Sequence, residues 1–388
     1  MNDLYPARAV VDLDAIAHNV GVLRERAGSA EVMAVVKADA YGHGLVPSAR
    51  AALAGGAAAL GVAQPYEALA LRAAGVEAPV LCWLTAPGTD LGPLVREGVE
   101  VAASARWTLD AVAAAAREQD RVAVVQLKAD TGLGRNGAYA LPLRSGPDTD
   151  WSDLVAHAAA LQAEGVLRVR GVFSHFAHAD APSHPTVRGQ QETFARAVAV
   201  AEEAGLRLEV RHLSNSAATL TTPEAAWDMV RPGLAVYGLT PVPEVGSAQD
   251  FGLRPAMRVV ARSVLAKRLP AGQGISYGHA YAPSRETTVL DVPIGYADGI
   301  PRHASGAGPV QVRGQRFSVS GRVCMDQFVV DVGDLDVDDG EEVVLFGPGD
   351  DGEPTAQEWA DAAGTISYEI VSRLGSRVPR EHVGAIAR

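Results

Sequence analysis

The chain has 388 residues, of which 48% are hydrophobic and 21% are charged, and its formal net charge is −12. This length predicts two domains rather than one. An acidic surface repels phosphate backbones and anionic lipid headgroups, and no run of about 18 apolar residues occurs, so neither nucleic acid nor a membrane is expected as a partner. The two cysteines are too few for a disulfide framework, and the first residues lack the features of a secretion signal. We therefore expect a cytoplasmic protein.

From about residue 30 to residue 240, short β-rich runs alternate with amphipathic runs rich in Ala, Leu, Glu and Arg. Eight β-rich runs within roughly 200 residues, most followed by a helical run, favour a closed (β/α)8 barrel over a doubly wound sheet. A long loop is expected over residues 136–150. The predicted strands are 32–37, 59–63, 80–83, 99–103, 122–128, 169–175, 208–213 and 229–237, and the predicted helices include 66–74, 109–118, 154–163 and 190–204.

The sequence pattern changes after residue 240. Residues 241–252 are rich in turn formers and are interpreted as a linker. Short β-like runs at 257–264, 287–292, 317–319 and 327–332 follow, separated by Gly, Pro and Asp, and Thr355 is expected to N-cap a helix that precedes another at 366–374. The predicted architecture is an α/β chain with an N-terminal (β/α)8 TIM-type barrel followed by a C-terminal mostly-β domain.

Three of the 34 basic residues are lysines, namely Lys37, Lys128 and Lys267. Lys37 ends the first predicted strand, and active sites of such barrels lie at the C-terminal ends of the strands. A desolvated amine at this place is suited to Schiff-base chemistry. The alternative is a lysine that extends from the strand end into solvent.

A phosphate site is predicted after the last two barrel strands. Asn215 and Ser216 follow the seventh strand, and Gly233 and Leu234 lie in the eighth, after Arg231. Loops after strands 7 and 8 commonly bind phosphate in this barrel, through hydroxyl and backbone N–H groups. The alternative for Asn215–Ser216 is an ordinary helix N-cap.

Two further patterns suggest other sites. Residues 132–137 (GLGRNG) match the dinucleotide pattern GxGxxG, but they follow the fifth strand and no helix comes closely after them, so no Rossmann site is expected. His175, His178, Asp180 and His184 resemble metal ligands, but their spacing suits no single helix face and prolines interrupt the segment. We expect loop histidines here and no metal.

Nine motifs then point to one family. In their order and content they resemble the alanine racemases, which are fold-type III enzymes dependent on pyridoxal 5′-phosphate (PLP), and they span nearly the whole chain. The motifs are AVVKADAYGHG (34–44), LKADTGLGR (127–135), FSHFAHAD (173–180), LSNSAATL (213–220), VRPGLAVYGL (230–239), ISYGHAY (275–281), IGYADG (294–299), VCMDQ (323–327) and TISYE (365–369).

The resemblance implies two acid/base groups on opposite sides of the substrate. Lys37 would carry PLP covalently and would remove or return the α-proton of D-alanine. Tyr277 would remove or return the α-proton of L-alanine. Arg135 matches an arginine near the catalytic phenol and the substrate carboxylate. Lys128 matches a lysine that is carbamylated in many members; the alternative is an ordinary lysine paired with Asp130 or another acid.

The resemblance also implies how the cofactor and substrate are held. Arg231 would face the pyridine nitrogen and leave it unprotonated, and His175 would position Arg231. Met325 matches a residue whose backbone N–H contacts the substrate carboxylate, and Tyr296 matches a residue at the entrance. The phosphate contacts would be Tyr41, Ser216, Gly233, Leu234 and Tyr368, with Asn215 beside them.

The function implied is interconversion of L- and D-alanine, which supplies D-alanine for peptidoglycan. Members form head-to-tail homodimers, so each Lys37 would be served by Tyr277 of the partner. The implied domains are an N-terminal strand (1–12) packed on the β domain, the barrel (13–240), the linker (241–252) and the β domain (253–388). The alternatives are a racemase acting mainly on serine, lysine or another amino acid, a PLP-dependent decarboxylase, which Arg231 argues against, and a non-catalytic PLP-carrier protein.

Overall fold

The computed structural model describes residues 4–141 and 150–387, which fall into two compact units. The barrel unit comprises Ile16–Ala40 and Leu45–Leu253. The β unit comprises the described residues of Met1–Ala15, Tyr41–Gly44 and Arg254–Arg388. Most of the loop predicted over 136–150 lies outside the described residues, although a short strand, β7 (Ala138–Tyr139), precedes that gap. Within the described part of the chain, no helix has the length and apolar character needed to cross a membrane.

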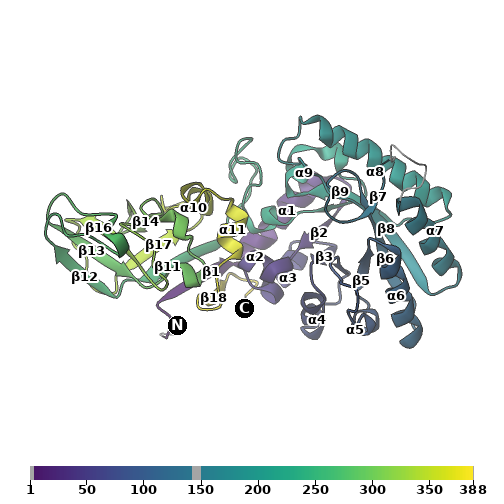
Figure 1. Ribbon diagram of the computed structural model, residues 1–388, viewed down its shortest axis with the longest axis horizontal. Coiled ribbons are helices and arrows are strands. Elements are labelled where there is room, and N and C mark those ends of the chain that lie inside the picture. Colours follow the sequence, from purple (N-terminus) through teal and green to yellow (C-terminus); the bar gives the residue numbers. More distant parts are fainter. Residues whose placement is uncertain (1–3, 142–149, 388) are drawn as a thin grey trace. The chain divides into compact units, whose positions relative to one another are not determined.

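Eight parallel strands of the barrel unit form a closed barrel, which confirms the predicted fold (Figure 1). Each strand pairs with the next in the order of the chain, β10 pairs with β2, and the pairing of β5 with β6 completes the ring. The strands are β2 (Glu31–Val35), β3 (Ala59–Val62), β4 (Val80–Cys82), β5 (Glu100–Ala103), β6 (Ala123–Asp130), β8 (Leu167–Phe173), β9 (Val210–Asn215) and β10 (Met229–Arg231).

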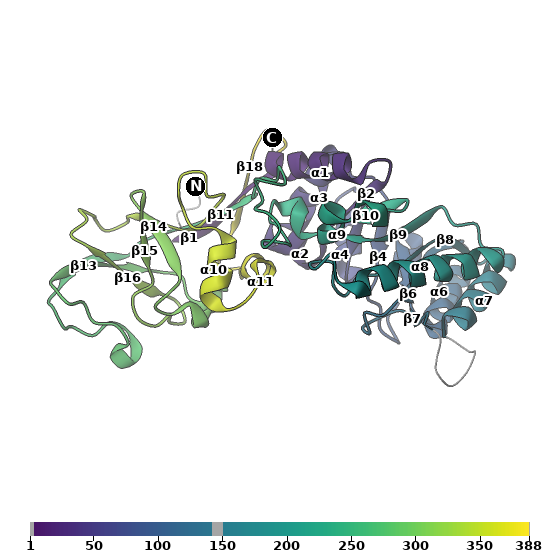
Figure 2. The same ribbon diagram turned by 90° about the horizontal axis from the view of Figure 1, so that it is seen from above.

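Helices surround the barrel, and Figure 2 shows α7 and α8 side by side on its outside. Helix α6 illustrates why they pack there: its buried Leu109, Val112, Ala113 and Ala116 fall on one face at helical spacing. The helices are α1 (Leu13–Ala27), α3 (Leu45–Ala54), α4 (Pro65–Ala73), α5 (Gly92–Arg96), α6 (Arg106–Glu118), α7 (Asp150–Ala163), α8 (Pro185–Glu203) and α9 (Ser216–Thr221).

Buried apolar side chains form one packed cluster inside the barrel, here called the interior layer. Seven strands each contribute one apolar residue to it, and β6 is the exception. Such layers are the packed core of a (β/α)8 barrel rather than a pore. The members are Met33, Ala59, Leu81, Ala102, Phe173, Val210 and Met229.

The eighth strand is shorter than predicted. It ends at Arg231 because Pro232 has no N–H to donate to a ladder, and the chain then turns through the 3-10 helix η2 (Leu234–Tyr237). Gly233 and Leu234 therefore lie after the strand and not in it. Tyr237 closes this turn by donating its hydroxyl to the Val35 carbonyl at 2.9 Å.

The β unit contains two sheets. In the six-stranded sheet, β1 pairs antiparallel with β11 and parallel with β18, and β12, β13 and β16 form a separate three-stranded sheet. The prediction missed β12, β14, β17 and β18. The strands are β1 (Ala7–Asp12), β11 (Met257–Arg262), β12 (Leu265–Leu269), β13 (Thr287–Val292), β14 (Pro309–Val312), β15 (Gln315–Ser318), β16 (Phe328–Gly333), β17 (Glu342–Phe346) and β18 (Arg380–Val383).

Both predicted C-terminal helices are present, as α10 (Ala356–Ala363) and α11 (Ser367–Ser372). Thr355 is the N-cap of α10, and its hydroxyl accepts a hydrogen bond from the Glu358 N–H at 3.2 Å. The Glu358 carboxylate accepts the Thr355 N–H in return at 2.8 Å, which completes a capping box.

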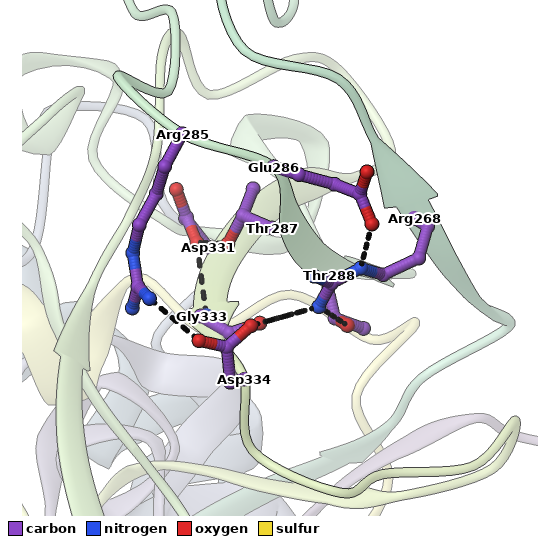
Figure 3. Close-up of polar contacts among 8 residues, drawn as sticks. All are labelled: Arg268, Arg285, Glu286, Thr287, Thr288, Asp331, Gly333 and Asp334. Carbon is purple, nitrogen blue, oxygen red and sulfur yellow. Dashed lines mark hydrogen bonds and ion pairs between the residues drawn. The ribbon is translucent and has the colours of Figure 1, made fainter.

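Polar side chains link the strands of the smaller sheet (Figure 3). Asp334 accepts from Arg268 at 3.0 Å and from Arg285 at 2.5 Å, and Asp331 accepts from Thr287 and from the Gly333 N–H. The arginine–Asp334 pairs are largely exposed, so each contributes little to stability. We interpret this network as support for the sheet and not as a site.

Candidate active site

A cavity of about 630 Å³ opens in the barrel unit beside Lys37. Strand β2 ends at Val35, so Lys37 lies at the C-terminal end of that strand, as predicted. Lys128 and Arg135 line the same cavity, together with two tryptophans that the sequence analysis did not single out, Trp83 and Trp107. The Lys37 Nζ lies 6.0 Å from the centre of the Trp83 ring. Three of the predicted site residues thus share one cavity.

The chain winds left-handed directly after Lys37. Helix α2 (Lys37–Gly42) has φ angles of +52° to +55° from Ala38 to Tyr41. This conformation costs roughly 1–2 kcal/mol per non-glycine residue, so neighbouring groups must hold it. The sequence analysis did not predict this turn.

Buried Glu67, at the start of α4, holds the turn on the barrel side. Its carboxylate accepts the Ala38 N–H at 2.6 Å and the N–H groups of Ala63 and Gln64 at 2.9 Å each. Asp39 adds a second contact by accepting the Leu45 N–H at 2.7 Å. These bonds fix the backbone that carries Lys37.

The charges around Lys37 and Lys128 are mostly positive. Burial lowers the pKa of Lys37, and Arg135 lowers it further, against an opposing effect of Glu67. Burial lowers the pKa of Lys128 to about 8, and Arg231, Arg135 and Lys37 add to this effect while Asp130 opposes it. Among the described residues, no carboxylate forms an ion pair with Lys128. Both amines therefore lose their protons more readily than an exposed lysine.

The glycine-rich segment 132–137 forms a loop around Asp130. One oxygen of this carboxylate accepts the N–H groups of Gly132, Leu133 and Gly134 at 2.9, 3.0 and 3.1 Å. Those N–H groups are thus used within the loop. The loop instead leads to Arg135 at the cavity.

Arg231 is buried and holds a defined orientation. Its guanidinium donates to the Ser174 carbonyl at 2.5 Å, to His212 Nδ1 at 3.0 Å and to His175 Nδ1 at 3.4 Å. Burial lowers its pKa to about 9, which leaves it charged at neutral pH. Burial and the charge of Arg231 hold the pKa values of His175 and His212 well below 6.5, so both rings are neutral.

The predicted phosphate residues meet at the ends of β9 and β10. The Ser216 hydroxyl accepts the N–H groups of Gly233 at 2.8 Å and Ala235 at 3.3 Å. Leu234 begins η2 next to Gly233. Asn215 caps α9, since its side-chain oxygen accepts the Ala218 N–H at 3.1 Å. The structure therefore brings Ser216, Gly233 and Leu234 together at the ends of these two strands, through hydrogen bonds that Gly233 and Ala235 donate to Ser216, and it gives Asn215 the ordinary capping contact.

The remaining predicted residues belong to the β unit. Tyr277, Met325 and Tyr296 are exposed by 71%, 53% and 42%. Their loops are tied together, because the Ser276 hydroxyl donates to the Arg322 carbonyl at 2.8 Å and the Tyr296 N–H donates to the Cys324 carbonyl at 3.0 Å.

Tyr41 and Tyr368 form a pair of rings in the same unit. Their centroids are 6.1 Å apart and their planes are tilted by 45°. Burial raises the pKa of Tyr41, and the neighbouring Tyr368 raises it further, so this phenol stays protonated and can donate a hydrogen bond.

The histidine-rich segment after β8 does not gather around a metal position. The rings of His178 and His184 stack at 4.0 Å, and His184 caps α8 by accepting the Thr186 N–H. His175 is instead held through its carbonyl, which accepts from buried Gln190 at 3.0 Å. Across residues 4–141 and 150–387, no group of three or more metal-ligating side chains is found.

A closed parallel barrel with an amine at a strand end, beside arginines in one cavity, is the arrangement of a (β/α)8 barrel enzyme, whose active site lies at the C-terminal ends of the strands. The comparisons with known proteins are more specific. The family profile "Alanine racemase, N-terminal domain" matches residues 11–241, and "Alanine racemase, C-terminal domain" matches residues 256–382. The chain therefore belongs to the alanine racemase family, and it is an enzyme.

Individual relatives extend over almost the whole chain. The alanine racemase of Frankia casuarinae is 58% identical over 98% of this chain and 97% of its own length, and that of Streptomyces coelicolor is 55% identical over 97% and 96%. The crystal structure of the enzyme from D-cycloserine-producing Streptomyces lavendulae matches with a TM-score of 0.95, at 52% identity and 98% coverage of both chains.

The lowered pKa values of His175 and His212 predict a pH dependence of stability. Because their pKa values are lower in the folded chain than in the unfolded chain, the unfolded state binds more protons below about pH 6.5. The free energy of unfolding should then fall with decreasing pH by up to about 1.4 kcal/mol per pH unit for each histidine. Urea unfolding of wild type and of His212→Asn between pH 5 and 7.5 measures this slope.

His212→Asn should flatten the slope, whereas the control His303→Asn, at an exposed histidine, should leave it unchanged. An equal slope in all three proteins would contradict the assignment of a buried neutral His212.

Proposed function

We propose that the chain interconverts L-alanine and D-alanine with PLP held covalently by Lys37, and that it supplies D-alanine for peptidoglycan. The observation that carries this proposal is the cavity in which the Lys37 amine lies with Lys128 and Arg135. The relatives named above support alanine as the substrate. A racemase acting mainly on serine or lysine is a separate outcome of the test below. The carrier-protein alternative is wrong, because the relatives along the full chain are enzymes.

The donor chemistry of the described residues fits PLP. The cofactor needs an amine for its aldehyde, a partner for its ring nitrogen and neutral donors for its phosphate, which Lys37, Arg231 and the Ser216–Gly233 group would provide. Leu234, Tyr41 and Tyr368 are proposed as further phosphate contacts, with Asn215 beside them. When bound, PLP would withdraw electrons from the substrate α-carbon and so acidify its proton.

Racemisation requires one group to take the α-proton on one face and another to return a proton on the opposite face. We assign these roles to Lys37 for D-alanine and Tyr277 for L-alanine. The lowered pKa of Lys37 favours this role, since a neutral amine is needed to accept a proton. Tyr277 is largely exposed within its own chain, which fits a phenol that serves the barrel of a second copy in a head-to-tail homodimer.

The other site residues orient the reacting groups. Arg231 keeps its proton, because a guanidinium deprotonates too reluctantly to transfer one to the ring nitrogen, and His175 supports it. That arrangement weakens electron withdrawal by the ring and limits side reactions. It also argues against a decarboxylase. Arg135 and the Met325 N–H would bind the substrate carboxylate, and Tyr296 would narrow the entrance to favour a small side chain.

Lys128 is proposed to be carbamylated. A cation near Lys37, Arg135 and Arg231 is unfavourable, and a pKa of about 8 leaves about a tenth of the amine neutral at pH 7. The neutral nitrogen can attack CO2 to form an N–C bond, and it then loses a proton to solvent. The product is an anion, which would attract Arg135 and hold it toward the substrate. The alternative is an unmodified Lys128 paired with Asp130 or another acid; one Asp130 oxygen accepts three N–H groups of its own loop, and among the described residues no carboxylate forms an ion pair with Lys128.

Racemisation in D2O by the PLP-loaded enzyme tests the two assigned bases. Wild type should convert L-alanine to α-deuterated D-alanine, with serine and lysine slower. Tyr277→Phe should lower racemisation by about 10²- to 10⁴-fold, as expected for loss of a general acid/base group, and should still exchange the α-proton of D-alanine through Lys37. Chiral chromatography with mass spectrometry measures both reactions.

Tyr66→Phe, which changes a tyrosine of similar exposure (68%), is the matched control and should behave as wild type. Undiminished racemisation by Tyr277→Phe would refute the role of Tyr277, and faster turnover of serine or lysine would establish the alternative substrate.

Carbamylation is tested by 13C NMR of the enzyme equilibrated with 13C-bicarbonate near pH 8. Wild type should show a carbamate carbon signal that is absent in Lys128→Arg, which keeps the charge but cannot form the carbamate. Lys267→Arg, at an exposed lysine, should retain the signal. A signal that survives Lys128→Arg, or its absence from wild type, would contradict the proposal.

A further inference from the structure

A chain of buried polar side chains crosses the barrel interior from Arg231. His212 Nε2 lies 2.5 Å from Gln126 Oε1, and Gln126 Nε2 donates to the Glu100 carboxylate at 2.5 Å. His212 and Gln126 have no exposed surface, and Glu100 is 6% exposed. The chain ends at Arg170, whose guanidinium binds the other Glu100 oxygen. We call His212, Gln126, Glu100 and Arg170 the interior relay.

The strand period explains why these side chains meet. Residues two apart on a strand share a face, and Glu100, His212 and Arg231 lie two positions from Ala102, Val210 and Met229 of the interior layer. On β6 the interior layer has no apolar member, and Gln126 lies inside instead, on the same face as Lys128. The relay side chains of β5, β6 and β9 therefore point into the barrel interior beside the apolar members of the interior layer.

A β-bulge accounts for Arg170. Val125 pairs with Val169 and Gln126 pairs with Gly171, so the register between β6 and β8 passes over Arg170. Bulges redirect a side chain locally, and here the guanidinium reaches Glu100 on β5. Glu100 thus has a cationic partner, which a carboxylate this buried requires.

The hydrogen-bond directions follow from the charge of Glu100. An ionised carboxylate only accepts, so Gln126 must direct its NH2 group toward Glu100 and its oxygen toward His212. The oxygen can only accept, so His212 Nε2 must carry the proton. Nδ1 is then unprotonated and accepts from Arg231, whose guanidinium only donates. Stacking on Phe173 at 5.0 Å and 13° holds the ring in this plane.

We infer that Glu100 and Gln126 are positioning residues for Arg231, because they fix the Nε2–H tautomer of His212 and so provide the acceptor that orients the Arg231 guanidinium. This inference rests on the proposed function for its effect on catalysis, since Arg231 is the proposed partner of the PLP ring. The opposite tautomer would place the Nδ1–H group against an N–H donor of Arg231, and the contact would be lost. The relay therefore connects the Glu100–Arg170 ion pair, at the start of β5, to Arg231 at the proposed cofactor site.

Side-chain 15N NMR of the full-length, PLP-loaded enzyme labelled with 15N-histidine tests the tautomer directly. The His212 signals, assigned by their loss in His212→Asn, should show a protonated Nε2 and an unprotonated Nδ1 in wild type. Glu100→Gln frees the Gln126 amide to turn, so Nδ1–H should become populated, and kcat/KM should fall on the order of tenfold, as for loss of a residue that orients a site ligand.

Two further variants separate positioning from general support of the fold. Glu209→Gln removes the exposed carboxylate that lies 3.5 Å from the Arg170 guanidinium. This variant should leave the His212 signals unchanged and kcat/KM within about twofold of wild type. The double variant Glu100→Gln, Gln126→Glu moves the carboxylate to β6, where it still accepts from Nε2–H, and should restore the wild-type signals and most of the activity.

A wild-type His212 protonated at Nδ1, or a Glu100→Gln variant with unchanged His212 signals, would overturn the inference. If wild type shows the Nε2–H tautomer but does not racemise alanine, the proposed function fails while the relay stands, so the two failures are distinguishable.

Discussion

Four positively charged side chains gather at the C-terminal end of the barrel, and their mutual repulsion determines which groups the site can bind. Lys37, Lys128, Arg135 and Arg231 influence one another there, and the burial of Lys128 and Arg231 limits screening of their charges by water. The nearby carboxylates of Glu67 and Asp130 each accept three backbone N–H groups, so their charge is used to hold loops. The four cations consequently favour the binding of anions. A cofactor phosphate, a substrate carboxylate and a carbamate on Lys128 would each supply one negative group.

The cations of the site are held in place by loops and neighbouring side chains. Glu67 stabilises a left-handed turn that non-glycine residues adopt only when held, and this turn carries the Lys37 amine at the cavity. On the far side of the site, the neutral rings of His175 and His212 provide acceptors for Arg231 without adding a further charge. Orientation of Arg231 thus depends on neutral acceptors, of which His212 is fully buried.

The alternation of β-rich and amphipathic runs is a local signal, and it predicted the barrel, the mostly-β region and the position of Lys37 at a strand end. Lys128, Arg135 and the role of Arg231 were implied by the resemblance to the family. The sequence also predicted the Thr355 cap from a local signal. It did not predict the left-handed turn, because Ala38 and Ala40 carry no local signal for positive φ and the stabilising carboxylate is Glu67, 29 positions from Ala38. Nor did it find Gln126 and Glu100, since polar residues inside predicted strands acquire a role only when the barrel closes β5 onto β6. Likewise, the strand 229–237 was wrong beyond Arg231 because Pro232 cannot continue the ladder.

We propose that a functional site combines Lys37 of one chain with Tyr277 of another, and a heterodimer of two variants can test this pairing. Lys37→Ala and Tyr277→Phe chains, co-expressed with different tags and purified through both, would carry one intact and one doubly defective site. Each homodimeric variant should be nearly inactive, and the heterodimer should regain about half of the wild-type racemase activity, as two-fold symmetry requires. A heterodimer as inactive as both parents would contradict it.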